Sequence, residues 1–259
     1  MRSQLLAARL ALVLLVLGAV TALGAVAGVR LGLIAYREGL TVMVPATLLG
    51  LAALAGALVW TFLALKRNEG SGKRVGMAAL AGALLFLYSP LTTAWARLTD
   101  LPIHDVTTNP EDPPRFVALA KLRRPGDNPL GFDGERRIHY RGEDATIAYL
   151  LHEYYRDLTK PVAKLMPGNP HPASTLFWRS FEAAKTMGWH IVDYSEKEGR
   201  IEATGASFWF GRIFDIVMRI EPSGIMGARV AIRIQSRSDR IDNGASIAQL
   251  KDVYALVSR

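Results

Sequence analysis

The sequence has 259 residues, of which 50% are hydrophobic, and a mean hydropathy of +0.18. It contains no cysteine, which excludes disulfides, zinc–thiolate sites and thiol nucleophiles. The net charge of +8 arises before residue 100: residues 1–99 hold nine Lys or Arg and two Asp or Glu, whereas residues 100–259 hold 22 and 21. The second part therefore lacks a broad basic surface, and no nucleic-acid partner is expected.

Residues 1–98 predict a transmembrane region of about three helices. Three apolar stretches cover about 10–29, 42–65 and 75–96, each long enough to cross about 30 Å of hydrocarbon. Pro90 should kink or end the third stretch. None of the three carries Asp, Glu, Lys or His, so no ion path or proton relay is predicted.

A signal peptide is the competing interpretation of the first stretch. Ala25-Val26-Ala27 fits the small-residue pattern of a cleavage site. The apolar run is long for a signal peptide, however, and two further spans follow. We therefore expect the first stretch to remain in the protein and contact membrane lipids.

Basic residues beside the spans predict the orientation. With the N-terminus and the second loop in the cytoplasm, six basic residues lie inside and two lie in the outer loop, as the positive-inside rule favours. The inner residues are Arg2, Arg9, Lys66, Arg67, Lys73 and Arg74, and the outer ones are Arg30 and Arg37. Three spans then carry the remaining chain out of the cytoplasm. In a bacterium this predicts a multi-pass inner-membrane protein with a periplasmic domain.

Gly24, Gly28 and Gly32 recur at every fourth position. Such small-xxx-small units let a neighbouring helix approach closely, within one chain or between two chains. Glycine is also common in membrane helices without any special role. Both self-association through these glycines and no role are consistent with the pattern.

Residues 99–137 predict a linker, because they are rich in Pro, Asp, Asn and Thr and show no periodicity. His104 and Asp105 are chemically able to bind a metal. No third ligand accompanies them, and no other histidine has metal-site spacing. Neither a metal site nor a cofactor is predicted.

Residues 138–259 predict a soluble α+β domain, an antiparallel sheet of about four to five strands packed against helices. The elements expected in chain order are a strand at 138–140, helices at 145–158 and 173–187, strands at 189–194 and 200–206, a hairpin within 207–244 and a helix at 245–257. Asp144 is positioned to cap the first helix. The outline is also that of helix-grip, lipid-binding folds, an analogy at the level of fold alone.

The hairpin alternates apolar and polar residues with period two, which is typical of half-buried strands. One face carries Phe214, Ile216, Met218, Ile220, Val230, Ile232 and Ile234, and the other carries Asp215, Arg219, Glu221, Arg229, Arg233, Gln235 and Arg237. An arginine fork on the polar face suits a carboxylate or phosphate. The alternative is a solvated or helix-covered face held by cross-strand ion pairs.

The candidate ligand-binding residues are Asp215, Arg219, Arg233, Arg237 and Asp242. Asp242 either caps the last helix or contributes to a site beside Arg237. No nucleophile elbow or phosphate-binding loop occurs, so no catalytic residue is assigned. The consecutive aromatics Phe208, Trp209 and Phe210 must point to both faces of the sheet, which leaves core packing and contact with lipid or a partner both open.

Five separated motifs lie between residue 101 and the end. They are LPIHDVTTNPEDPPRF at 101–116, GW at 188–189, GRIEAT at 199–204, WFGRIFDIVMRI at 209–220 and IQSRSDRIDNGAS at 234–246. Together they resemble a bacterial family, the domain of unknown function number 1499, whose members often carry amino-terminal membrane spans. The resemblance implies no established activity, cofactor or substrate.

The chain departs from the family pattern at several polar positions. Where the family has two consecutive acids, this chain has Phe214 followed by Asp215. In the later motif Ser236, Arg237, Asp242 and Gly244 match, whereas Ile234 stands for Arg, Asp239 for Gly, Ile241 for Ser and Ser246 for Asn. If these positions form a site in the family, this member keeps only part of it.

The sequence thus favours a membrane-anchored extracytoplasmic protein, a binding or interaction module of the cell envelope for a lipid or an anionic ligand. One alternative is an enzyme with a polar site near Asp215, Arg237 and Asp242. The other is a structural scaffold that assembles through the glycine face.

Overall fold

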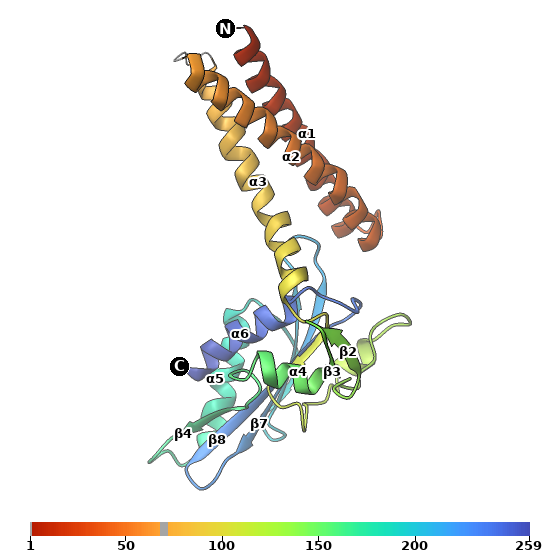
Figure 1. The fold of residues 1–259 in the computed structure, drawn as a ribbon. Coiled ribbons are helices and arrows are strands. Elements are labelled where there is room, and N and C mark those ends of the chain that lie inside the picture. The colour runs from red at the N-terminus through yellow and green to blue at the C-terminus, as the bar shows by residue number, and fades with distance from the viewer. Residues whose placement is uncertain (1, 68–71) are drawn as a thin grey trace. The chain divides into compact units, whose positions relative to one another are not determined.

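The structure is a computed structural model that describes residues 2–67 and 72–259 (Figure 1). The chain divides into two compact units, Met1–Leu98 and Thr99–Arg259. The first unit consists of α1 (Arg2–Arg30), α2 (Tyr36–Arg67) and α3 (Lys73–Thr99). All three helices are long and apolar enough to cross a membrane, as the sequence predicts. α3 continues through Pro90 rather than ending there.

Small residues let the three helices of the first unit pack closely. Ala11, Ala57 and Ala79 come from different helices and form one buried cluster. At Gly76 an added Cβ atom would lie 2.2 Å from the ring of Trp60, so only glycine fits there. Close approach of helix backbones through Gly and Ala is the usual way in which membrane helices associate.

The predicted glycine face, Gly24, Gly28 and Gly32, is wrong at Gly32. α1 ends at Arg30, and Gly32 lies in the turn beyond it with a φ of +69°. Gly32 therefore shares no helix face with Gly24 and Gly28. A Cβ atom at Gly28 would meet the side chain of Ile34 at 3.1 Å, whereas one at Gly24 would meet no described atom within 4 Å.

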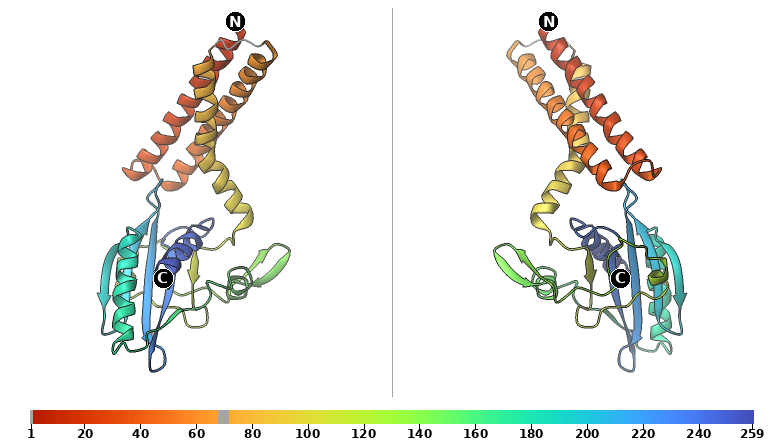
Figure 2. Two further views of the ribbon diagram at one scale, coloured as in Figure 1. Left: turned by 90° about the vertical axis from the view of Figure 1, so that its left-hand side faces the viewer. Right: turned by 90° about the vertical axis from the view of Figure 1, so that its right-hand side faces the viewer.

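The second unit is built on a six-stranded antiparallel sheet (Figures 1 and 2). Its strands are β1 (Asp105–Thr107), β4 (Val162–Leu165), β5 (His190–Ser195), β6 (Arg200–Ala206), β7 (Ile213–Pro222) and β8 (Gly227–Ser236). The order is β1-β8-β7-β6-β5, and β4 pairs with β8 along the edge that β1 also uses. The predicted α+β class and antiparallel sheet are confirmed.

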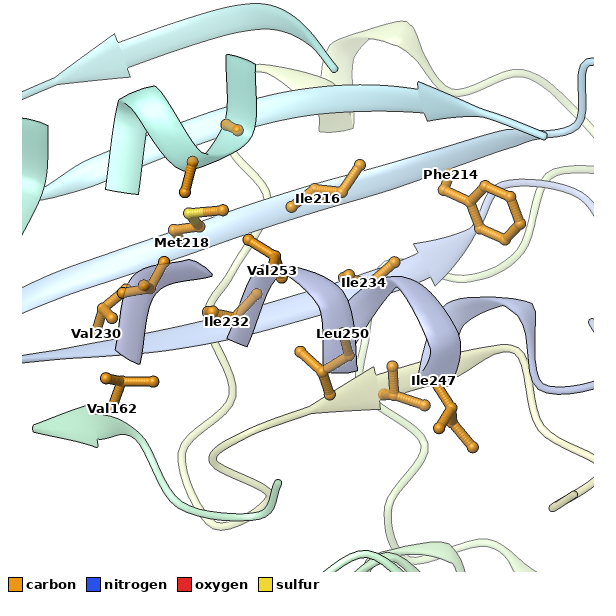
Figure 3. Packing of buried hydrophobic residues seen from close by; sticks show 14 of the residues in the cluster. Val162, Phe214, Ile216, Met218, Val230, Ile232, Ile234, Ile247, Leu250 and Val253 are labelled. Carbon is orange, nitrogen blue, oxygen red and sulfur yellow. The ribbon is translucent and has the colours of Figure 1, made fainter. Parts of the chain in front are cut away.

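One face of the sheet packs against α5 (Pro172–Thr186) and α6 (Ala245–Ser258). β7 and β8 are in register, with Ile216 opposite Ile234 and Met218 opposite Ile232. The apolar positions predicted from the alternation all enter this core (Figure 3). On the helices, the inward residues include Leu176, Phe177, Ile247, Leu250 and Val253.

Several elements differ from the sequence prediction. The strand expected at 138–140 does not join the main sheet; it is β2 (Arg137–Tyr140), which pairs only with β3 (Glu143–Thr146) in a separate hairpin. The following helix is short, α4 (Ile147–Tyr154), and Thr146 rather than Asp144 caps it. The Pro-rich stretch before α5 contains β4, whose four residues are too few to show a period.

The linker predicted at 99–137 is instead built into the second unit. β1 lies within it and pairs with β8, and a 3-10 helix, η1 (Leu119–Leu122), follows. Residues 108–132, which we call the cover segment, run over the polar face of the sheet and contact β6, β7 and β8. Several of its backbone groups bond to side chains of the sheet rather than to a regular ladder, among them the amides of Val117 and Leu119 and the carbonyl oxygen of Leu130.

Candidate functional site

The polar face of the β7–β8 hairpin lies beneath the cover segment rather than in solvent. The residues Asp215, Arg233 and Gln235 are buried, each at most 1% exposed. Phe116 and Leu119 of the cover segment pack on Val217 of the same face. The predicted alternation is therefore correct, but both faces of the sheet are covered.

Arg233 occupies the centre of this face. Its Nε donates to Asp105 Oδ1 at 3.0 Å and its Nη2 donates to Asp105 Oδ2 at 2.6 Å, a two-pronged pair that fixes β1 on β8. The same guanidinium donates to the carbonyl oxygens of Pro114 at 3.2 Å and Leu130 at 2.9 Å. It also stacks 4.8 Å from the ring centre of Phe116. Every part of this cation thus has a partner in the fold.

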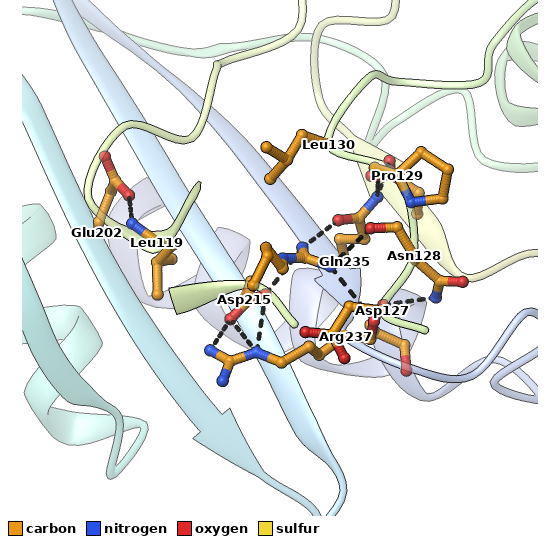
Figure 4. Close-up of polar contacts among 12 residues, drawn as sticks. Leu119, Asp127, Asn128, Pro129, Leu130, Glu202, Asp215, Gln235 and Arg237 are labelled. Atoms are coloured by element: carbon orange, nitrogen blue, oxygen red, sulfur yellow. Dashed lines mark hydrogen bonds and ion pairs between the residues drawn. The ribbon is translucent and has the colours of Figure 1, made fainter. Parts of the chain in front are cut away.

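Gln235 joins β8 to both β1 and the cover segment, and Figure 4 shows its contact with Pro129 of that segment. Its amide nitrogen donates to Asp105 Oδ2 at 2.9 Å and to the carbonyl oxygen of Pro129 at 2.8 Å. Its amide oxygen accepts from Arg123. Next to it, the Asn128 side chain donates to the carbonyl oxygens of Ser236 and Asp239, both at 2.8 Å.

Asp215 is held between two arginines. Arg237 donates to it from Nη2 at 2.5 Å and from Nε at 3.2 Å (Figure 4). Arg123 of the cover segment forms an ion pair with its other oxygen at 2.8 Å. Burial lowers the pKa of Arg123, and the Asp215 carboxylate opposes that shift.

These residues form one connected group, which we call the arginine cluster: Asp105, Arg123, Asp215, Arg233, Gln235 and Arg237. Three arginines face two aspartates, so the group carries one positive charge in excess. Arg237, at 16% exposed, is its most accessible cation. An anion that approached the cluster would meet Arg237 first.

Glu202 is a further buried charge that the sequence reasoning did not single out. Its carboxylate accepts from three successive backbone amides, those of Val117 at 2.8 Å, Ala118 at 3.1 Å and Leu119 at 2.8 Å. Arg200 donates to it at 2.7 Å. The strand pattern places Glu202 on the polar face, but its amide partners lie in a segment without periodicity, so the sequence offers no signal for the pairing.

Arg219 and Asp242 lie outside the arginine cluster. Arg219 donates to Asp112 Oδ2 at 2.6 Å and pairs with Glu221 at 2.8 Å. Asp242 accepts from the backbone amide of Ser246 at 3.2 Å and from its hydroxyl group, at the start of α6. Burial raises the pKa of Asp242 to about 6, and the hydrogen bonds from Ser246 oppose the shift.

Only two of the three residues of the enzyme alternative bond to each other in the ranges that the structure describes. Asp215 and Arg237 are in contact, but no hydrogen bond or ion pair joins either of them to Asp242 in the described ranges. Among those residues, no three His, Asp or Glu side chains are grouped to hold a metal ion.

The two best-formed hollows of the described chain also lie elsewhere. One, beside Ile103 and Phe132, leaves no room for a water molecule. The other is an open depression of about 580 Å³ beside the β2–β3 hairpin, lined by residues that include Arg137 and Tyr149. Neither is lined by any of the five candidate ligand residues.

Comparison with known proteins identifies the second unit. No curated protein matches the chain. A family model described as "Protein of unknown function (DUF1499)" matches residues 105–256. The match begins at β1 and ends within α6, so it includes the cover segment, the sheet and both core helices. Because this is more than half of the sequence, the chain belongs to the DUF1499 family of proteins of unknown function.

Proposed function

We propose that this protein is a membrane-anchored module of the cell envelope whose α+β domain lies outside the cytoplasm and binds a ligand or partner. The observation that carries the proposal is the odd number of apolar helices combined with the distribution of basic residues. Six Lys or Arg flank the spans on one side and two occupy the loop on the other. The positive-inside rule then favours export of Thr99–Arg259.

A reporter fused after Arg259 tests the orientation. Alkaline phosphatase is active only after export. Green fluorescent protein fluoresces in the cytoplasm but does not fluoresce after export by the general secretion route. The proposal expects phosphatase activity without fluorescence. Fluorescence without phosphatase activity would place the domain in the cytoplasm and overturn the proposal.

We further propose that the ligand is anionic and that Arg237 is the residue that contacts it. The support is the excess positive charge of the arginine cluster together with the partial exposure of Arg237. The guanidinium of Arg237 donates to Asp215 through Nε and Nη2. Its remaining N–H groups are donors that suit a carboxylate or phosphate group. A phospholipid headgroup and a soluble organic acid share this chemistry.

Mass spectrometry of the detergent-extracted protein tests this ligand and separates its two sources. The wild type is expected to carry a co-purified anionic molecule that is depleted at least fivefold in Arg237→Gln. The matched control is Arg229→Gln, an exposed arginine of β8 that pairs with Glu221 of β7 and lies outside the arginine cluster. Equal ligand content in both variants would refute the assignment of Arg237.

A further inference from the structure

Four large apolar side chains are exposed at one end of the sheet. Phe208 and Trp209 lie in the β6–β7 loop, Ile213 begins β7, and Ile241 lies between β8 and α6. Phe208 is 79% exposed and Ile241 is 52% exposed. We call these four residues the aromatic edge. Figure 2 shows both loops at the end of the sheet opposite the β7–β8 turn.

The two loops that carry the aromatic edge are fastened to each other. Arg212 of the first loop forms an ion pair with Asp239 of the second at 3.0 Å. The backbone amide of Arg237 donates to the carbonyl oxygen of Ile213 at 2.9 Å. The aromatic edge is therefore one surface on a fixed support rather than two independent loop tips.

The same end of the sheet holds the residues that directly follow α3. The backbone amide of Asp242 donates to the carbonyl oxygen of Ile103 at 3.0 Å. Asp100 packs against Gly244 so closely that a Cβ atom there would lie 2.1 Å from its carboxylate. Only Thr99 separates Asp100 from Leu98, the last residue of the first unit. Two residues of chain span about 7 Å, so the chain enters the second unit at this end of the sheet directly after the last apolar span.

We propose that the aromatic edge lies in the lipid–water interface of the bilayer that α3 crosses. The inference rests on the membrane anchoring proposed above and adds a second, non-helical contact with lipid. Aromatic side chains favour the headgroup level, where an apolar ring is buried while its polar part stays hydrated. Arg240, exposed beside Ile241, supplies a positive charge for anionic headgroups.

The opposite end of the sheet offers a matched comparison. Ile225 in the β7–β8 turn is 99% exposed and Met226 beside it is 53% exposed. This surface is apolar too, but it lies a full ten-residue strand away from the end that Asp100 contacts. The inference assigns lipid to the aromatic edge and water to Ile225.

Spin labels test this in the complete protein. Because the chain has no cysteine, Phe208→Cys, Ile225→Cys and Leu58→Cys each give one labelled site, the last in the middle of α2. The protein is placed in bilayers of phosphatidylethanolamine and phosphatidylglycerol. Power-saturation electron paramagnetic resonance then compares collisions with oxygen, which concentrates in lipid, and with a nickel chelate, which stays in water.

The expected result is a label at 208 whose ratio of oxygen to nickel collisions exceeds that at 225 by at least threefold. Equal ratios at 208 and 225 overturn the inference. A label at 208 shielded from both reagents also overturns it, because that result indicates contact with protein. The label at 58 separates the two proposals: if it is in lipid while the label at 208 is in water, the anchor stands and this inference fails.

A second measurement does not depend on a label within the β6–β7 loop. A label at Ile241→Cys is expected to gain at least twofold in nickel collisions when Trp209→Asp is added. Trp209→Phe, which keeps the apolar ring, should leave the value unchanged. No change with Trp209→Asp would show that the tryptophan does not hold this edge at the lipid surface.

Discussion

Arg233 shows why so many charged side chains occupy one face of the sheet. The cover segment is a loop, and a loop that is buried must find donors for its carbonyl oxygens. Arg233 and Gln235 supply them to Pro114, Pro129 and Leu130. Arginine suits this role because its five donors serve Asp105 and the carbonyl oxygens together. The polar positions at the centre of β8 therefore stabilise the fold, and the most exposed cation of the arginine cluster is Arg237, directly after β8.

The Arg233–Asp105 pair gives the first prediction. Asp105→Asn leaves a buried guanidinium without its counter-charge and should lower the free energy of unfolding by about 3–5 kcal/mol. The control is Asp112→Asn, which removes the mostly exposed partner of Arg219 and should cost less than about 1 kcal/mol. Urea unfolding of the detergent-solubilised protein measures both. Equal small losses would show that the buried pair does not hold β1 on the sheet.

Asp242 gives a prediction about pH. Its pKa is about 6 in the folded protein and 3.8 in the reference state. Because the folded state holds the proton more tightly, the stabilisation from this group is complete below about pH 4 and is lost as the pH rises through 6. The difference corresponds to about 3 kcal/mol.

Asp242→Asn removes this titration. The free energy of unfolding of the variant, relative to that of the wild type, should therefore increase between pH 4 and pH 7.5. Urea unfolding of both proteins across that range measures the difference between their free energies of unfolding. The contributions of other titrating groups are the same in both proteins and cancel, including that of His104, whose pKa is lowered mainly by burial. A constant difference between the two proteins across the range would contradict the assigned pKa.

At the scale of elements, the cover segment takes the place that a second layer of helices would occupy in other α+β domains. It contributes one turn of 3-10 helix and a series of buried polar contacts, and it directly follows the short strand β1. Glu202 fixes the start of η1, because three amides that have no helical partner all donate to its carboxylate. Its role is that of a helix cap supplied by a distant strand.

Glu202→Gln replaces one acceptor oxygen by a donor that faces these amides. Hydrogen bonds to charged groups are each worth about 1.5–3 kcal/mol, so a loss of about 2–3 kcal/mol is expected. Trypsin should then cut faster after Lys121, which lies in η1. Glu198→Gln is the control, because that exposed carboxylate pairs with the same Arg200 and with none of the three amides. Equal cleavage rates would show that Glu202 does not fasten the cover segment.

At the scale of the whole molecule, the boundary of the folded domain lies near residue 99 rather than 138. A fragment of residues 99–259 should unfold cooperatively, because it contains β1 and the cover segment. A fragment of residues 138–259 should not fold, since it exposes Val217, removes Arg123 from Asp215 and leaves Arg233 without Asp105. Amide proton dispersion in NMR spectra distinguishes the two states. A well-dispersed spectrum of the shorter fragment would contradict this boundary.

The sequence by itself determined the parts of this protein that depend on local periodicity. Three long apolar runs predicted the three helices, and period-two alternation predicted β7 and β8 together with the residues of their shared core. The helices expected at 173–187 and 245–257 correspond to α5 and α6. Each of these signals lies within a window of about 20 residues, because it reflects a single face of a single element.

Only the tertiary structure decided that the polar face is buried and what covers it. Arg233 and Asp105 are 128 residues apart in the chain, and Glu202 lies 83 residues from the amide of Leu119. A loop that bonds to distant side chains has no period of its own, so its composition alone resembles that of a linker. The candidate site was thus partly predictable as a row of charges, but its partners were fixed by packing between segments that share no local pattern.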